Sequence, residues 1–275
     1  MTIVEVLKLS ADYLQKHGSD SSRLDAELLL AHTLQVRRLD LYLKFDRPLV
    51  EDELAAYRAL IARRGKGEPV AYLVGAKEFM GLTFEVTRDV LVPNPDTEVL
   101  VQRAVAIARE AEGRLRVADV GTGSGCIAIS IAHYAPNTEV WACDISPEAL
   151  EIAERNVARH AAGERVRLVR GDLMDPLSGK FDLVCANLPY VPAGARLPAE
   201  VTAQPAGALY ADEGGAALIA RLLAQVPGRL APGGRVLAEL DPSIAGDVVA
   251  RATGFGGHRL HRDAGGHERV LEAWS

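Results

Sequence analysis

From Leu115 to Gly125 the chain reads LRVADVGTGSG, an apolar run that ends in three closely spaced glycines. The apolar part predicts a buried strand, and the pattern of residues 127–132 predicts a helix directly after the glycines. Glycines permit a tight turn and a close approach of the backbone to a ligand, and the helix N-terminus offers unpaired N–H groups to a carboxylate or phosphate. The stretch therefore predicts a strand, a ligand-binding turn and a helix.

The spacing of the glycines indicates which ligand this turn binds. A dinucleotide-binding turn has the pattern G-x-G-x-x-G, whereas Gly121, Gly123 and Gly125 stand at every second position here. Asp144 ends the next apolar run, where a carboxylate can accept both hydroxyls of a ribose. These features argue against NAD and favour S-adenosylmethionine, with its amino-acid moiety at the glycine turn and its ribose at Asp144.

The segment Asn187-Leu188-Pro189-Tyr190 follows the strand pattern of residues 181–186, at the edge where open α/β sheets bind ligands. The side-chain carbonyl of Asn187 and the backbone carbonyl of Leu188 can accept the two N–H groups of an NH₂ group. Two such acceptors hold a weakly nucleophilic planar nitrogen in place and favour the charge that develops on it. Pro189 fixes the backbone, and Tyr190 offers a flat wall for stacking. The segment predicts methyl transfer to an amide or exocyclic amine nitrogen.

Three further acidic residues each have two interpretations. Asp172 ends a strand pattern and precedes Leu173; the carboxylate could bind the exocyclic amine of adenine while Leu173 packs on the ring, or it could cap a turn. Asp96 and Glu98 resemble catalytic acids, but acids in the first turn of a helix also stabilise the helix dipole.

Strand and helix patterns alternate after residue 92, which predicts a parallel sheet covered on both faces. Strands are expected near residues 115–120, 138–143, 166–170, 181–186 and 234–240, and helices near residues 124–135, 147–161, 213–230 and 243–252. Residues 256–274 read as two strands that add an antiparallel edge. Residues 191–212 are rich in Ala, Pro and Gly, and we expect them to form the longest structureless loop, of the kind that is often functional.

The N-terminal part has a different pattern. Apolar residues recur at helical spacing in residues 4–14, 24–31 and 51–64, and then alternate from residue 77 to residue 92 as in a β-hairpin. We expect a helical recognition domain over residues 1–75, a linking hairpin over 76–92 and the cofactor-binding domain over 93–275.

Composition narrows the possible partners. The formal net charge of −6 argues against an extended nucleic-acid footprint, and charged residues among the first apolar positions exclude a signal peptide or membrane span there, so we expect a cytoplasmic protein. The three cysteines, Cys126, Cys143 and Cys185, lack metal-ligand spacing and are interpreted as buried thiols. His258, His261 and His267 are interpreted as surface or packing residues, and we expect no metal site.

With these motifs the chain resembles the protein-(glutamine-N5) methyltransferases that act on peptide chain release factors. The resemblance covers nearly the whole length. It rests on Arg23–Leu29, Gly67–Gly75, Val90–Glu98, Gly121–Gly125, Asn187–Tyr190 and Ala231–Gly234.

The resemblance implies an α/β fold: a doubly wound, mostly parallel seven-stranded methyltransferase sheet with a small N-terminal helical domain. The resemblance also implies S-adenosylmethionine as the cofactor. The methyl acceptor is then the glutamine in the Gly-Gly-Gln loop of a release factor, and the helical domain helps to bind this protein substrate. The cofactor-binding residues are then Gly121, Thr122, Gly123, Ser124, Gly125, Asp144, Leu173 and Asn187, together with Asp172. The substrate-binding residues are Asn187, Leu188, Pro189 and Tyr190, of which Asn187, Pro189 and Tyr190 are expected to be catalytic.

The chain departs from the family pattern at several positions. The family usually has a second proline at Leu188, an arginine at Asn94, a glutamate at Gln204, and Glu-His-Gly where this chain has residues 239–241. Leu188 contributes through its backbone, so the chemistry should be retained, whereas Asn94 and Gln204 bear on the substrate.

Two other functions stay open at this point. Adenine-N6 methyltransferases of RNA or DNA also use Asn-(Leu/Pro)-Pro-Tyr, although the acidic balance and the N-terminal position of the helical part disfavour them. A non-catalytic binding protein of the same fold is the other alternative.

Overall fold

The structure is a computed structural model that describes residues 1–275 except for the side chain of Glu213. The chain forms two compact units. The helical unit contains Met1–Ala76 and Leu197–Ala203, and the sheet unit contains Lys77–Arg196 and Gln204–Ser275. The chain therefore leaves the sheet unit after Arg196, contributes a short segment to the helical unit, and returns at Gln204.

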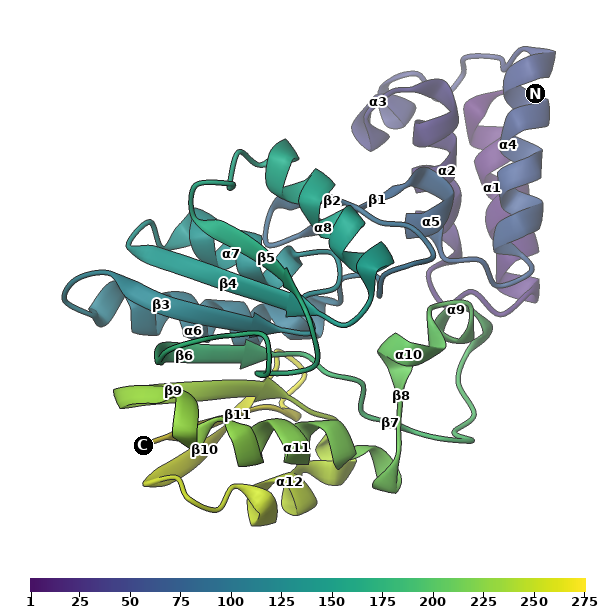
Figure 1. Cartoon of the computed structure of the whole chain (residues 1–275). Coiled ribbons are helices and arrows are strands. Elements are labelled where there is room, and N and C mark those ends of the chain that lie inside the picture. Colours follow the sequence, from purple (N-terminus) through teal and green to yellow (C-terminus); the bar gives the residue numbers. More distant parts are fainter. The chain divides into compact units, whose positions relative to one another are not determined.

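The helical unit is built from α1 (Ile3–Lys16), α2 (Ser22–Leu34), α3 (Arg38–Leu43), α4 (Glu51–Arg64), α5 (Val70–Val74) and α9 (Ala199–Thr202) (Figure 1). The three predicted helices are confirmed as α1, α2 and α4. The sequence patterns missed α3 and α5, because helices of six and five residues are too short to show a period. Among the described residues, no helix combines the length and apolarity needed to cross a membrane.

Residues 191–212 are not structureless, contrary to the sequence prediction. They form β7 (Val191–Pro192), α9, α10 (Ala206–Leu209) and β8 (Tyr210–Ala211). An ion cluster explains why α9 belongs to the helical unit: buried Arg64 on α4 is bonded to buried Asp25 (2.7 Å) and to the exposed Glu200 on α9 (2.5 Å). A one-turn helix depends on such tertiary contacts, which residue composition does not reveal.

The sheet unit contains a seven-stranded sheet in the order β10-β11-β9-β6-β3-β4-β5. Its strands are β3 (Leu115–Val120), β4 (Thr138–Asp144), β5 (Val166–Arg170), β6 (Phe181–Ala186), β9 (Leu230–Glu239), β10 (Gly257–Arg262) and β11 (Glu268–Trp274). The β11 strand is antiparallel to β9 and β10, and the other pairs are parallel. The predicted mostly parallel sheet with an antiparallel edge is confirmed.

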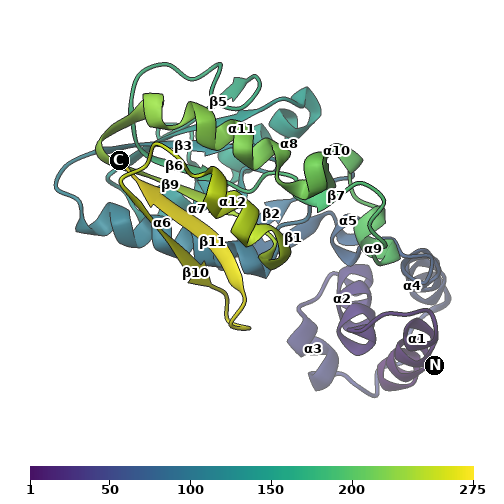
Figure 2. The ribbon, with the colours of Figure 1, turned by 90° about the horizontal axis from the view of Figure 1, so that it is seen from below.

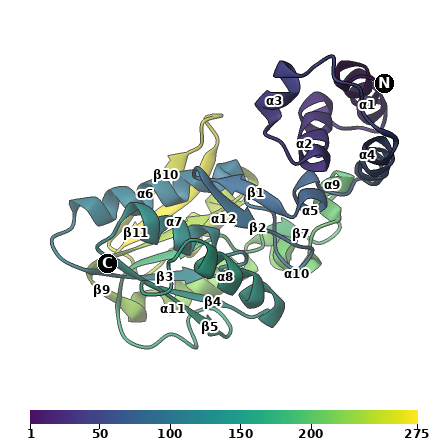
Figure 3. The ribbon, with the colours of Figure 1, turned by 90° about the horizontal axis from the view of Figure 1, so that it is seen from above.

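Helices cover both faces of this sheet. They are α6 (Glu98–Glu110), α7 (Cys126–Tyr134), α8 (Pro147–Arg159), α11 (Ala217–Gln225) and α12 (Ala245–Arg251). Along β6, Leu183 and Cys185 join the core under α6 and α7, whereas Val184 and Ala186 join the core under α11 and α12. Figures 2 and 3 view the sheet from opposite edges, and in both α6 and α11 lie on opposite sides of it.

One predicted helix is shorter than expected. The pattern predicted residues 213–230, but α11 covers only Ala217–Gln225. Gly214 and Gly215 before it adopt positive φ, and Pro227 follows it, so the regular helix ends on both sides.

The predicted hairpin is present as β1 (Ala76–Phe79) and β2 (Leu82–Glu85), and it is part of the core of the sheet unit. Phe79 and Phe84 are buried, with ring centroids 6.2 Å apart in an edge-to-face arrangement. At the turn, the Met80 N–H donates to Glu98 (2.9 Å) and the Met80 carbonyl accepts from Tyr134 (2.6 Å). Glu98 is thus a structural residue that anchors the hairpin.

A buried carboxylate joins three strands and α6. Glu272 on β11 is 1% exposed and accepts hydrogen bonds from Arg103 on α6 (2.9 and 3.0 Å) and from Arg235 on β9. The Nε2 atom of His261 on β10 lies 2.6 Å from the same carboxylate. Burial raises the pKa of Glu272, but the bonds to Arg103, Arg235 and His261 outweigh burial and lower this pKa to about 2.

We expect Glu272→Gln to destabilise the sheet unit by about 3 kcal/mol at neutral pH, since the donors lose their buried charged partner. Because the folded-state pKa is lowered, the contribution of Glu272 is complete above its usual pKa of 4.5 and is lost as the pH falls toward 2. The difference in unfolding free energy between wild type and variant should therefore shrink over that range. Denaturant unfolding followed by tryptophan fluorescence measures it, because Trp141 and Trp274 both lie in the sheet unit. A difference in unfolding free energy that does not change with pH would contradict the stabilising role of the ionised Glu272 carboxylate.

Candidate active site

The glycine turn after β3 has the conformation that only glycine adopts easily. Gly121, Gly123 and Gly125 have φ values of 75°, 54° and 81°. A Cβ atom at Gly121 would lie 2.8 Å from the Leu188 side chain, so the turn packs directly on the Asn187–Tyr190 segment. A Cβ atom at Gly123 would meet no atom within 4 Å, because this residue faces a cavity.

Asp119, the residue of β3 that precedes Val120 and the turn, supports the turn from within the core. One oxygen of its carboxyl group accepts from the Thr122 hydroxyl (2.6 Å) and from the Ala128 N–H (3.1 Å) on α7. Complete burial raises the pKa of Asp119 to about 7, against these two hydrogen bonds. This role of Asp119 is not among the predictions from the sequence, although an acid inside a buried strand pattern is a signal for one.

Asn156 on α8 holds the turn from the other side. Its Nδ2 atom donates to the carbonyls of Ser124 and Glu85, both at 2.9 Å, and its Oδ1 accepts from the Glu85 N–H at 2.7 Å. The side chain is fully buried. Asn156 thereby connects the glycine turn to the end of the β2 strand.

Asp144 lies beside the turn at the end of β4. One of its oxygens accepts from the Gly123 N–H (2.9 Å), and the other accepts from the Ser146 N–H (3.0 Å). A carboxylate has about four acceptor positions, so each oxygen can still accept from a ligand hydroxyl. Asp144 lines the same cavity as Gly123.

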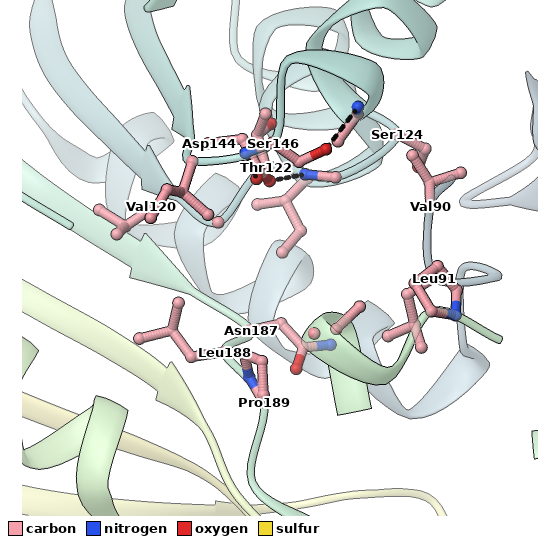
Figure 4. Close-up of a pocket in the computed structure, with 18 of the residues that line it drawn as sticks. Val90, Leu91, Val120, Thr122, Ser124, Asp144, Ser146, Asn187, Leu188 and Pro189 are labelled. Atoms are coloured by element: carbon pink, nitrogen blue, oxygen red, sulfur yellow. Dashed lines mark hydrogen bonds between the residues drawn. The ribbon is translucent and has the colours of Figure 1, made fainter. Parts of the chain in front are cut away.

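This cavity has a volume of about 490 Å³ and lies entirely within the sheet unit. The predicted site residues that line it are Gly121, Thr122, Gly123, Ser124, Asp144, Asp172, Leu173, Asn187, Leu188 and Pro189. Figure 4 shows the glycine turn and Asp144 on one side of the cavity, with Asn187, Leu188 and Pro189 across from them. Residues at or just after the ends of four strands, β3, β4, β5 and β6, thus meet around one space.

Two predicted site residues do not line the cavity. Gly125 begins α7, and a Cβ atom there would press against Ile129 (3.1 Å) and Ala153 (3.4 Å), so this glycine serves helix packing. Tyr190 is largely buried, with its hydroxyl 3.3 Å from Glu239 on β9. The structure therefore does not place Tyr190 on the cavity wall, where the sequence analysis expected it.

A third wall comes from the segment between the hairpin and α6, and the sequence analysis did not assign it to the site. Val90 and Leu91 line the cavity there (Figure 4), and so does Asn94. The Val92 N–H donates to the Gln204 side chain (2.9 Å), which fixes this wall to the returning loop. Asn94 and Gln204, two departures from the family pattern, therefore both lie at this wall.

Asp172 and Leu173 follow β5, the neighbour of β4 in the sheet, and both line the cavity. The Asp172 carboxylate is paired with Arg221 on α11 at 2.5 Å, and both residues line the cavity. Leu173 has a φ of 46°, which is uncommon for a branched residue, and its carbonyl accepts from the Cys143 thiol (3.1 Å). Strained backbone of this kind is found preferentially at functional sites.

Asn187 is held in one orientation at the end of β6. Its Nδ2 atom donates to the hydroxyl oxygen of Thr97 at 3.0 Å. Because the amide nitrogen has this partner, the amide oxygen is left to accept from a ligand. Of the two other candidate acids, Asp96 pairs with Arg269 (3.2 Å) and Glu98 accepts from the Met80 N–H of the hairpin (2.9 Å), and neither lines the cavity.

The cysteines and possible metal ligands lie elsewhere. Cys126, Cys143 and Cys185 are buried free thiols, as predicted. Among the described residues, no group of three or more His, Cys, Asp or Glu side chains could hold a metal ion.

A sheet whose glycine turn, acidic strand end and Asn-Leu-Pro-Tyr segment meet at one edge is the arrangement expected of a methyltransferase. The Methyltransferase small domain family matches residues 95–204, and the PrmC N-terminal domain family matches residues 5–75. A solved methyltransferase from Pyrococcus furiosus shares the fold, with a TM-score of 0.55 at 21% identity over 79% of this chain and 96% of that one.

Relatives specify the family further. A release factor glutamine methyltransferase from Rhodopirellula baltica is 43% identical over 284 residues, which cover 98% of this chain and 95% of that protein. Another from Geobacter sulfurreducens is 40% identical over 276 residues, with the same coverage of 98% and 95%. The chain belongs to the release factor glutamine methyltransferase family, which confirms the resemblance found in the motifs.

We expect Asn156→Leu to loosen the glycine turn, because the buried Ser124 carbonyl and two partly buried backbone groups of Glu85 would lose their partner. Hydrogen exchange of the amides of residues 123–127 should accelerate about tenfold or more. Asn137→Leu is the matched control, since Asn137 also donates two hydrogen bonds to backbone carbonyls but does so away from the turn. Equal exchange at the turn in wild type and Asn156→Leu would show that Asn156 does not hold it.

Proposed function

We propose that this enzyme transfers a methyl group from S-adenosylmethionine to the side-chain amide nitrogen, N5, of the glutamine in the Gly-Gly-Gln loop of a peptide chain release factor. The observation that carries the proposal is the orientation of Asn187. Its amide nitrogen is bound to Thr97, so an acceptor oxygen faces the cavity that Asp144 and the glycine turn line. An acceptor at that place selects a substrate nitrogen that carries hydrogens.

The cavity fits S-adenosylmethionine in size and in the kind of its polar groups. Its volume of about 490 Å³ is within the usual range of small-molecule sites, roughly 300–1,000 Å³. The open space at Gly123 and the N-terminus of α7 beside it suit the carboxylate of the amino-acid moiety, since a helix N-terminus favours an anion. The Asp144 carboxylate suits the ribose hydroxyls, and Leu173 and Asp172 suit the adenine. When bound, S-adenosylmethionine supplies a methyl group on a positively charged sulfur.

The residues of the chain then orient the acceptor nitrogen. An amide nitrogen is a weak nucleophile, because its lone pair is delocalised into the carbonyl group. The Asn187 side-chain oxygen and the Leu188 backbone carbonyl accept the two N–H groups and leave the face of the nitrogen exposed to the methyl. The same two acceptors stabilise the positive charge that develops on the nitrogen as the new bond forms. The extra proton leaves to solvent afterwards, so the site needs no strong base.

The helical unit is proposed to bind the protein substrate. Four large apolar side chains on α3 and directly after it are exposed: Leu39, Tyr42, Leu43 and Phe45, by 62%, 52%, 71% and 56%. A cluster of this kind in a short stretch favours contact with another protein. It also agrees with a formal net charge of −6, which does not favour tracking of a nucleic-acid backbone.

Gly123→Val tests the cofactor position. A valine side chain there would project into the cavity and should abolish S-adenosylmethionine binding in isothermal titration calorimetry. Gly113→Val is the matched control, because Gly113 also has positive φ and open space around it but does not line the cavity. Both variants should lose about 1–2 kcal/mol of stability from the backbone strain, and only Gly123→Val should lose binding. Retained binding by Gly123→Val would mean that the turn does not face the cofactor.

Asn187→Ala tests the proposed chemistry. We expect transfer of radiolabelled methyl groups to a release factor to slow by about 10²–10³, the usual effect of removing one preorganised polar contact at a reacting centre. The affinity for S-adenosylmethionine should stay close to that of the wild type. Leu188→Pro is the companion variant and should keep its activity, because proline retains the backbone carbonyl. Near-normal turnover by Asn187→Ala would refute the amide-orienting role.

A further inference from the structure

A buried series of hydrogen bonds runs from Asn187 through Thr97 to Glu239; Asn187 and Thr97 line the cavity, and Glu239 does not. The Asn187 amide nitrogen donates to Thr97 Oγ1 at 3.0 Å, and the Thr97 hydroxyl is hydrogen-bonded to the carboxyl group of Glu239 on β9. The Tyr190 hydroxyl lies 3.3 Å from Oε1 of the same carboxyl group. Thr97 is 2% exposed and Glu239 is fully buried, so water does not compete for these bonds.

The donors and acceptors in this series can be arranged in only one way when Glu239 is ionised. A carboxylate accepts hydrogen bonds and donates none, so the single proton of the Thr97 hydroxyl must point at Glu239. The Thr97 oxygen can then only accept from Asn187. Asn187 must therefore turn its NH₂ group toward Thr97 and its oxygen toward the cavity.

The opposite orientation of the Asn187 amide would disable the site. It would direct an NH₂ group at the NH₂ group of the substrate glutamine, and two donors cannot bond each other. Nothing in the Asn187 side chain itself prevents this orientation, because the oxygen and nitrogen of an amide have nearly the same size. The choice must come from the partner of the amide.

Glu239 is also unusual as a core residue. Burial raises the pKa of its carboxyl group to about 7, against the hydrogen bonds from Thr97 and Tyr190 and the charge of Arg269. Its Oε2 atom has no hydrogen-bond partner within the described part of the chain. An unpaired buried carboxyl oxygen is costly for folding, which indicates a purpose other than stability.

We propose that Glu239 and Thr97 are positioning residues that set the hydrogen-bond polarity of Asn187, so that its oxygen faces the methyl acceptor. This inference rests on the proposed amide methylation. Through Tyr190, Glu239 also holds the end of the Asn187–Tyr190 segment. Neither Glu239 nor Tyr190 lines the cavity, so both act through the segment and not on the substrate directly.

Thr97→Val is the first test, since valine keeps the shape of threonine and removes the hydroxyl. We expect kcat on a release factor to fall about 10- to 100-fold, while the dissociation constant for S-adenosylmethionine stays within about threefold of wild type, a difference below 1 kcal/mol. Thr97→Ser should restore the rate, because it restores the hydroxyl. Thr138→Val is the matched control: its hydroxyl is also buried and bonded, at 2.7 Å to the Ala135 carbonyl, but lies outside the site.

Glu239→Gln tests whether the carboxylate acts through Thr97. Glutamine can offer an NH₂ group to Thr97 and so permits the reversed series of hydrogen bonds, which should lower kcat. In the Thr97→Val background the same change should have little further effect, because the connection is already broken. Additive losses from the two changes, or equal rates for Thr97→Val and Thr138→Val, would overturn the proposal.

An NMR measurement tests the orientation without any methyl acceptor. The side-chain NH₂ signals of Asn187 are those missing from the spectrum of Asn187→Ala. We expect their protection from hydrogen exchange to be lost in Thr97→Val and kept in Thr97→Ser and Thr138→Val. Unchanged protection in Thr97→Val would show that the Asn187 amide is not held by a hydrogen bond to Thr97. If instead the protection behaves as expected but no release factor is methylated, the proposed function fails and the positioning of Asn187 stands.

Discussion

The parallel register of three neighbouring strands is the constraint on which the site depends. Val120 on β3 lies opposite Cys143 on β4 and Ala186 on β6, so all three strands end at the same level of one edge. The residues that follow Val120, Cys143 and Ala186 in the chain are Gly121, Asp144 and Asn187, respectively. The parallel register therefore brings parts of the chain that are far apart in sequence around one cavity.

Buried polar groups then fix what the register brings together. Asp119 and Asn156 hold the glycine turn, and Thr97 with Glu239 holds Asn187. These groups are expensive to bury, yet each one fixes the direction of a donor or acceptor at the cavity. The site is thus rigid where the methyl donor and the acceptor nitrogen have to meet, which fits a reaction that needs orientation more than acid or base strength.

The strand ends could be predicted from the sequence, because each one is marked locally. The glycine turn, Asp144 and Asn187 follow short apolar runs, and the period of the flanking helices shows the parallel sheet. The wall at Val90 and Leu91, the role of Thr97, and the membership of α9 in the helical unit could not be predicted. Those features depend on contacts between residues that are distant in sequence, such as Val92 with Gln204 or Arg64 with Glu200. No local sequence pattern indicates such pairs. Tyr190 was assigned to the cavity from its ring alone, whereas its hydroxyl bonds Glu239 in the core.

Selection of an amide nitrogen is the property that separates this site from that of an adenine methyltransferase with the same segment. It can be measured by offering the wild-type enzyme S-adenosylmethionine together with a release factor and ribosomal RNA in one mixture, and by reading both products by mass spectrometry. Membership of the release factor glutamine methyltransferase family and the formal net charge of −6 predict one methyl group on N5 of the Gly-Gly-Gln glutamine and none on the RNA. Methylation of an adenine, or a release factor of unchanged mass, would contradict an amide-selective site.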